Sequence, residues 1–289
     1  MDSFSIHPDT TVGPVDLAVA DLARSERFYH EVIGLKPLAR DNGTLILTAD
    51  GATPLLQLHE QPGAHPRPRR STGLYHFAIL TPSRLALARS LRNLAETRWP
   101  LTGASDHLVS EALYLDDPDG NGIEIYRDRA REEWPRQGGQ IQMAVDPLDV
   151  DGVLAELEHD DRPWDGLEPA TTIGHVHLHV ADLRAAKAFY CDVLGFELMV
   201  SYGHSALFVS AGGYHHHLGL NVWAGVGAPP PPPEAAGLRY YVVELPNQEA
   251  LEQVVARVRE AGIAAEQTGE GVFMRDPSQN GVVLRARRG

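Results

Sequence analysis

Cysteine is nearly absent from this chain of 289 residues, which contains only Cys191. A single cysteine excludes an internal disulfide and is typical of a reducing compartment, so we expect a cytoplasmic protein. Basic residues are also in short supply, with 25 Lys and Arg against 39 Asp and Glu and a net charge of −14. A nucleic-acid-binding domain usually has a basic face, so this balance argues against nucleic acid as a partner.

Long apolar runs and the common nucleotide-binding motifs are missing as well. No apolar stretch approaches the length of about 18 residues that a membrane-spanning helix needs, so we expect no membrane insertion. The first residues, MDSFSIHPDTT, have neither the basic nor the apolar segment of a signal peptide. The chain has no GxGxxG motif and no P-loop, so we expect no nucleotide cofactor.

The sequence does contain an internal repeat. Residues 15–35 (VDLAVADLARSERFYHEVIGL) and 176–196 (VHLHVADLRAAKAFYCDVLGF) share an alternating strand, an Asp-Leu pair, an amphipathic helix with Phe-Tyr, and a glycine stop. Two weaker units run from residues 73 to 126 and from 237 to 285. A repeat of this kind indicates a fold that is built from similar modules. The four predicted modules are residues 10–62 (one), 72–128 (two), 172–225 (three) and 237–287 (four).

Each module is predicted to have the element order β-α-β-β-β. Its opening strand has the two-residue alternation of a half-buried strand, and its helix begins after a capping residue such as Asp21, Ser83 or Asp182. The run DPDGNG (117–122) lacks the spacing of a calcium loop and predicts a turn between strands. A small curved sheet leaves one face open, so modules should pair to close a cavity. The predicted fold is therefore α+β, with four βαβββ modules pairing into two open barrels.

The halves of the chain are predicted to be residues 1–130 and 172–289, joined by a linker of residues 131–171. Within them, three polar residues stand where the sister modules have residues unsuited to metal binding. They are His76, Glu124 and His175, and their counterparts are Tyr240, Val283 and Pro14. Two imidazoles and one carboxylate form the facial triad that is associated with non-haem Fe(II), and it leaves three metal positions open.

Module pairing decides whether these three residues can meet. Pairing one with two and three with four would leave each barrel with an incomplete ligand set. Pairing two with three brings all three ligands into one barrel, and pairing one with four gives a degenerate barrel. We predict the second arrangement because it alone completes the metal site. The competing interpretation is that these are three unrelated buried polar residues.

The chain resembles the vicinal oxygen chelate superfamily and, within it, the four-module extradiol ring-cleaving dioxygenases of the catechol 2,3-dioxygenase type. The most specific part of the resemblance is His107-x5-Leu113-Tyr114-x2-Asp117-Pro118-x-Gly120-x3-Glu124, which follows the extradiol signature. Ser105 departs from the signature two residues before its histidine. The resemblance implies that His76, Glu124 and His175 hold Fe(II), with Mn(II) as an alternative. It also implies that the partners are a small aromatic diol and O2.

The resemblance also implies roles for residues around the metal. Tyr114 corresponds to a tyrosine that hydrogen-bonds a substrate oxygen, and His107 is a further candidate beside it. The run Tyr214-His215-His216-His217 resembles a pair of family histidines that includes the acid–base residue. Aligning the strand that follows selects His216, and a slip by one residue would select His215 or His217 instead.

Several more residues are candidates for binding the substrate. They are His177, His217, Asn221 and Trp223. His177 and its neighbour His179 are alternatively hydrogen-bonded core histidines, and the triple histidine is alternatively a solvated turn.

The predicted function is that of a non-haem Fe(II) extradiol dioxygenase acting on a catechol-type substrate. One alternative is a metal-dependent lyase or isomerase of the glyoxalase kind, which usually requires a second glutamate ligand. Another is a non-enzymatic binding protein of the same fold, such as a drug-sequestering resistance protein. The sequence does not identify the diol and leaves the oligomeric state open.

Overall fold

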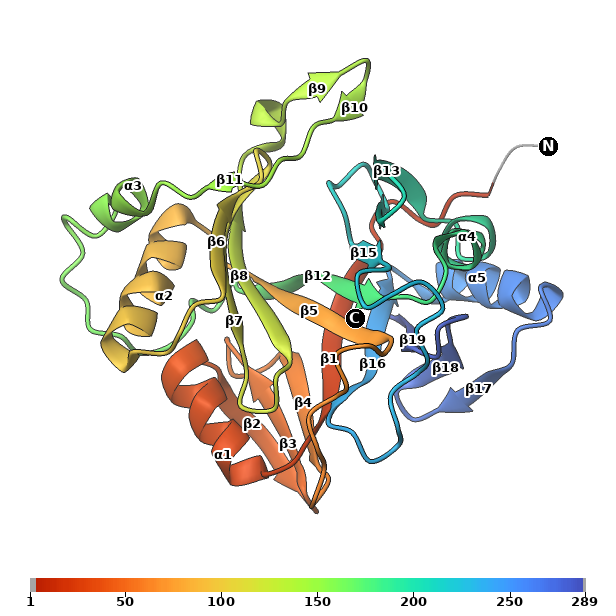
Figure 1. Ribbon diagram of the computed structural model, residues 1–289, viewed down its shortest axis with the longest axis horizontal. Helices are drawn as coiled ribbons and strands as arrows, with labels where there is room; N and C mark the ends of the chain where they lie inside the picture. The colour runs from red at the N-terminus through yellow and green to blue at the C-terminus, as the bar shows by residue number, and fades with distance from the viewer. Residues whose placement is uncertain (1–3, 288–289) are drawn as a thin grey trace.

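The computed structural model describes residues 4–287 and contains two large curved β-sheets with helices packed on them (Figure 1). In spatial order, the first sheet consists of β17 (Ala265–Thr268), β18 (Gly271–Arg275), β19 (Gly281–Ala286), β16 (Gly237–Leu245), β1 (Thr11–Val19), β4 (Pro54–Glu60), β3 (Thr44–Thr48) and β2 (Lys36–Asp41). The second consists of β11 (Asp146–Pro147), β6 (Gly103–Asp106), β7 (Ser110–Asp116), β8 (Gly122–Asp128), β5 (Gly73–Leu80), β12 (Thr172–His179), β15 (Leu218–Asn221), β14 (Ala206–Ser210) and β13 (Glu197–Tyr202). The predicted α+β fold of curled, half-barrel sheets is confirmed.

Each sheet is joined at its centre by strands that are far apart in the sequence. In the first sheet β1 pairs antiparallel with β16, and in the second β5 pairs antiparallel with β12. These four strands cross the middle of Figure 1, with α2 on one side and α4 and α5 on the other. One continuous hydrophobic core runs through both sheets and the helices that cover them.

Three helices begin directly after the capping residues that the sequence predicts. The described helices are α1 (Leu22–Arg27), α2 (Arg84–Thr97), α3 (Val150–Ala155), α4 (Leu183–Lys187), α5 (Gln248–Glu260), the short 3-10 helix η2 (Arg131–Glu133) and two π-helical turns, η1 (Phe28–Ile33) and η3 (Ala188–Val193). The side chains of Asp21, Ser83 and Asp182 each accept a hydrogen bond from the backbone three residues on, as predicted. Gly34 ends η1 in the left-handed region at φ 93°, which favours glycine. No helix among residues 4–287 is both long and apolar enough to cross a membrane.

The repeated Phe-Tyr motif ties neighbouring modules together. The Tyr29 hydroxyl donates to the Asp117 carboxylate at 2.9 Å, and the Tyr190 hydroxyl donates to Asp276 at 3.0 Å. Asp117 also accepts hydrogen bonds from the backbone of Asp119 and from the backbone and side chain of Asn121. The run DPDGNG is therefore a carboxylate-centred turn between β7 and β8, as predicted. The turn is held from the other sheet by the tyrosine of the preceding module.

The segment between the two halves has more structure than the predicted linker. Strands β9 (Arg136–Gln137) and β10 (Gln140–Ile141) form a small hairpin, which projects at the top of Figure 1. Strand β11 then pairs antiparallel with β6 and becomes the edge of the second sheet. Helix α3 packs on α2. The segment thus brings residues 143–145 close to the inner side of the second sheet.

Candidate metal centre and active site

Strand register places three potential ligands on one face of the second sheet. In β5, Ala78 is opposite Glu124 of β8 on one side and opposite His175 of β12 on the other. His76 lies two residues from Ala78 along β5 and so shares its face, because side chains alternate along a strand. The small alanine side chain leaves the space between its two larger neighbours open. His76, Glu124 and His175 therefore converge from three adjacent strands.

The distances between their ligand atoms fit a single metal ion. The Nε2 atoms of His76 and His175 are 3.3 Å apart, and the Glu124 Oε2 atom lies 3.1 Å from each of them. Two ligands at right angles, each about 2.1 Å from an ion, are about 3 Å apart. All three residues are buried, and their ligand atoms form a candidate metal-binding group. The donor set fits a metal bound on one octahedral face, with positions left for other ligands.

Burial and charge hold two of these groups in the protonation states that a metal requires. Burial lowers the pKa of His76, although the neighbouring Glu124 opposes the shift. Burial would raise the pKa of Glu124, but the two imidazoles outweigh it and hold that pKa well below its usual range. A neutral imidazole and an ionised carboxylate are the forms that bind a metal ion.

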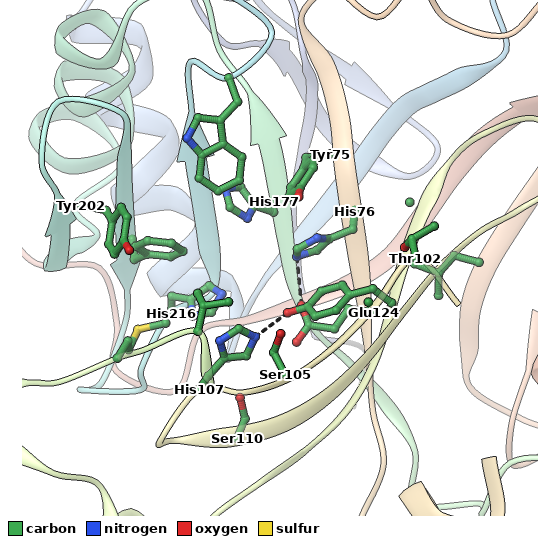
Figure 2. A pocket seen from close by; sticks show the side chains of 18 of the residues that line it. Tyr75, His76, Thr102, Ser105, His107, Ser110, Glu124, His177, Tyr202 and His216 are labelled. Atoms are coloured by element: carbon green, nitrogen blue, oxygen red, sulfur yellow. Dashed lines mark hydrogen bonds and ion pairs between the residues drawn. The ribbon is translucent and has the colours of Figure 1, made fainter. Parts of the chain in front are cut away.

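A cavity of about 540 Å³ opens beside this group; His76 and Glu124 line it, whereas the buried His175 does not. Figure 2 shows His76, Glu124, His107 and His216 turned toward this common space. The predicted site residues that line it are His76, His107, Tyr114, Glu124, His177, His216 and Trp223. Its volume is within the range of about 300–1,000 Å³ that is usual for small-molecule sites.

His107 and Tyr114 form a hydrogen-bonded pair at the wall of this cavity. The His107 Nδ1 atom lies 2.7 Å from the carbonyl oxygen of Ala144, and its Nε2 atom lies 2.6 Å from the Tyr114 hydroxyl. A carbonyl oxygen can only accept, so Nδ1 carries the proton and Nε2 of the neutral ring accepts from Tyr114. Burial, followed by the charge of Glu124, raises the pKa of Tyr114 well above its ordinary value. Tyr114 therefore remains protonated and keeps its oxygen lone pairs available to a ligand.

His216 packs against His175 of the candidate metal-binding group and contacts His215. Its ring centroid is 4.1 Å from that of His175, and its Nδ1 atom is 2.8 Å from the Nδ1 atom of His215. The His215 Nε2 atom is in turn 2.9 Å from an oxygen of Asp128. Burial, followed by the neighbouring His175, lowers the pKa of His216 well below its ordinary value.

Two of the predicted substrate-binding residues lie elsewhere. The buried His217 does not line the cavity, and its Nδ1 atom contacts the Ser210 hydroxyl and the backbone N–H of Ala211. Asn221 is fully buried, and its side-chain oxygen contacts His179 and accepts from the backbone of Trp223. Both residues support the sheet around the site instead of facing the cavity.

The structure adds cavity residues that the sequence did not single out. Strand alternation could have identified those on β13 and β14, whereas the segment after β10 has no pattern that points to a site. They include Tyr75, Ser105, Asp116, Met143, Val145, Val200, Tyr202 and Phe208.

Comparisons with known proteins agree with this architecture. The family model described as "Glyoxalase/Bleomycin resistance protein/Dioxygenase superfamily" matches residues 11–125 and 172–284. A protein of Bacillus subtilis (strain 168) named catechol-2,3-dioxygenase is 51% identical over 276 residues, which are 94% of this chain and 96% of that protein. Glyoxalase I from Zea mays is 19% identical and has a TM-score of 0.56, with coverage of 96% of this chain and 92% of that one. The cppA protein of Streptococcus pneumoniae TIGR4 is 12% identical with a TM-score of 0.55, covering 96% and 99% of the two chains. These two structures share the fold, and the predicted resemblance is confirmed: the chain belongs to the Glyoxalase/Bleomycin resistance protein/Dioxygenase superfamily.

Proposed function

We propose that this protein is an extradiol dioxygenase that uses Fe(II), held by His76, Glu124 and His175, to open the ring of a catechol-type substrate. The enzyme class follows from the relative named catechol-2,3-dioxygenase, which is 51% identical over nearly the whole chain. The observation that carries the proposal for the site is the meeting of the three ligand atoms within 3.3 Å of one another beside a cavity. Two imidazoles and one carboxylate are the ligand set of non-haem iron oxygenases, and Mn(II) accepts the same set.

The proposed reaction consumes the diol and O2 without a further reductant. The ring C–C bond next to the two hydroxyl-bearing carbons breaks, and both atoms of O2 enter the product. One cleaved carbon becomes a carboxylate and the other an aldehyde, so the diol supplies all the electrons that reduce O2. When bound, the metal supplies Lewis acidity and holds the two reactants within reaction distance.

His216 is the proposed acid–base residue. Asp128 accepts from the N–H at His215 Nε2, which leaves the Nδ1 lone pair of a neutral His215 to accept from His216. His216 then carries its proton on Nδ1 and presents the Nε2 lone pair on the other side of its ring. This arrangement supports removal of a proton from the diol by Nε2 and its return during ring opening.

Tyr114 and His107 are proposed to orient the substrate. The Tyr114 hydroxyl donates to His107, so its oxygen can accept a hydrogen bond from a hydroxyl of the diol. When His107 turns away or gains a proton, the same hydroxyl can donate to a substrate oxygen. His177 and Trp223 line the same cavity and are proposed to contact the ring or its substituents.

We also propose that modules two and three are the catalytic pair and that modules one and four are a structural pair. In the first sheet, the buried carboxylate of Asp16 is held by Arg239 at 3.0 Å and by His59 at 2.8 Å. In the repeat, Asp16 corresponds to His177, which lines the cavity of the second sheet, so an ion pair occupies the matching position in the first sheet. Among residues 4–287, the candidate metal-binding group is that of the second sheet.

The test is anaerobic reconstitution with Fe(II), followed by measurement of O2 uptake on catechol and of the yellow ring-opened product. We expect O2 uptake and product to match in the unaltered protein. Both should be lost in His175→Ala and in Glu124→Gln, which removes the ligand charge with little change of shape. His204→Ala changes an exposed histidine in the turn after β13 and should retain iron and turnover.

Other outcomes would contradict the proposal in different ways. Tight metal binding without O2 uptake on any diol would favour the glyoxalase-like lyase or isomerase. Full activity in His175→Ala would show that the ligand assignment is wrong. Stoichiometric binding of an aromatic compound by metal-free protein, without turnover, would favour a binding protein.

A further inference from the structure

The cavity has two chemically different ends. Near the ligands its wall is polar, with the imidazole and hydroxyl groups described above. Toward the surface, the wall is formed by apolar side chains of β13 and the segment before β11, chiefly Val145, Val200 and Tyr202. Phe208 of β14 lies deeper, with its ring centroid 5.0 Å from that of His216. Figure 2 shows Tyr202 across the cavity from Glu124. A diol bound at the polar end would therefore extend any ring substituent toward an apolar wall.

The apolar wall continues to the surface as an exposed rim. Val145 is 69% exposed, Tyr202 56%, Trp223 48% and Tyr75 40%, and all four line the cavity. Tyr75 and Trp223 are in edge-to-face contact, with ring centroids 5.1 Å apart. Exposed apolar side chains that gather around a cavity mark a binding surface more often than isolated ones do.

Among the described Asp, Glu, Lys and Arg side chains, only acidic ones line the cavity. None of the described residues that line it is Lys or Arg, and the acidic side chains are Glu124 and Asp116. Asp116 lies at the outer end of β7, where its charge adds to those that raise the pKa of the nearby Tyr75. The proposed metal ion would bind the diol oxygens of any catechol at the polar end, so its charge acts on all of these substrates there. A carboxylate on a ring substituent would lose hydration toward the outer end without a Lys or Arg to pair with it, which is costly.

We infer that the site selects neutral catechols with an apolar ring substituent and discriminates against catechols that carry a carboxylate. This inference rests on the proposed dioxygenase function and names its substrate class. The cavity of about 540 Å³ offers room for such a substituent, and the rim residues supply its apolar contacts. The absence of a Lys or Arg from the described cavity lining, together with the acidic Asp116, disfavours a substrate carboxylate.

The test compares two substrates that differ in one charge, 3,4-dihydroxyphenylacetate and its methyl ester. With the Fe(II)-loaded protein, we expect kcat/KM from O2 uptake to be at least tenfold higher for the ester. Equal or faster turnover of the acid would overturn the inference, as would faster turnover of the amine dopamine than of the ester. Absence of O2 uptake on every diol tested, with catechol, the ester and the acid included, would instead be a failure of the proposed function, so the two failures are distinguishable.

Matched variants test whether the charge of the cavity causes the discrimination. Val145→Lys adds a cation at an exposed rim position, and Val145→Gln is its neutral control. We expect the ester-to-acid ratio of kcat/KM to be about tenfold lower in Val145→Lys than in Val145→Gln, as one charge in a partly solvated site can produce. Asp116→Asn should lower the ratio in the same direction. Glu266→Gln removes an equal charge from exposed β17 and should leave the ratio unchanged.

Two results with these variants would contradict the inference. Equal ratios in Val145→Lys and Val145→Gln would overturn the electrostatic explanation. A similar change in Glu266→Gln and Asp116→Asn would show that net charge, and not the cavity, sets the preference.

Discussion

Replacement of His217 by Asn should make the protein less sensitive to mild acid. The Nδ1 atom of His217 faces the N–H of Ala211 at 3.2 Å, and a backbone N–H can only donate. That nitrogen must therefore be an unprotonated acceptor in the folded protein. Burial, followed by the neighbouring imidazoles of His215 and His175, lowers the pKa of His217 to about 3. In the unfolded chain, an imidazole has a pKa of about 6.5.

The size of the effect follows from these two pKa values. Between pH 3 and 6.5 the unfolded chain binds a proton that the folded protein does not, so stability falls as the pH decreases through this window. From pH 7.5 to 5.5, His217 should remove about 1.4 kcal/mol of unfolding free energy. This figure changes little for any folded pKa below about 5. In His217→Asn the amide oxygen can accept in place of Nδ1, and the titrating group is gone.

Urea denaturation at both pH values measures the difference. His217→Asn will lose ring packing at either pH, but subtracting one pH from the other cancels that loss. We expect its pH-dependent loss to be about 1.4 kcal/mol smaller than that of the unaltered protein at equal metal content. The exposed control His204→Asn should show no such difference. If the pH dependence of His217→Asn equals that of the unaltered protein, folded His217 accepts the proton freely and the reasoning is wrong.

Two other pairs of substitutions test the fold that supports the site. Tyr29→Phe removes a buried hydrogen bond to the Asp117 carboxylate and should lower the unfolding free energy by about 1.5–2 kcal/mol, as should the corresponding Tyr190→Phe. A loss below about 0.5 kcal/mol in urea denaturation would show that these links add little. Gly122→Ala would place a methyl group against a backbone carbonyl oxygen of β5 and should weaken metal binding. Gly281→Ala makes the matching clash in the first sheet and should leave metal binding unchanged. Equal metal affinity of the two variants, measured by titration, would contradict this assignment.

Local features of the chain were readable from the sequence because they depend on near neighbours. The capping side chains Asp21, Ser83 and Asp182 act within three residues, and the turn of DPDGNG forms around its own first carboxylate. The α+β class follows from four repeats of the same element order. Comparison of sister modules also singled out three polar residues whose ligand atoms lie together in the structure as a candidate metal-binding group.

The run His215-His216-His217 is a case in which the sequence alone does not show which side chain faces the cavity. Adjacent residues of an extended segment point to opposite sides. A register error of one residue would therefore assign a core-facing histidine to the cavity, and a cavity-facing one to the core. His216 lines the cavity, whereas His217 contacts the backbone behind it and His215 contacts Asp128. The sequence contains no signal strong enough to fix this register.

The modules, their caps and turns, and the residue types available for metal chemistry could be derived from the sequence. Which strands became neighbours, and which residues surround the site, depended on tertiary packing. His76 and His175 are 99 residues apart in the chain, and Glu124 and His175 are 51 apart. Contacts over such separations depend on how whole sheets pack, and the pairing of β5 with β12 brings these ligands together. The apolar rim depends on the same packing. Val145 lies in a segment without a sequence pattern, and the alternation of β13 does not reveal that Tyr202 lines the same cavity as Val145.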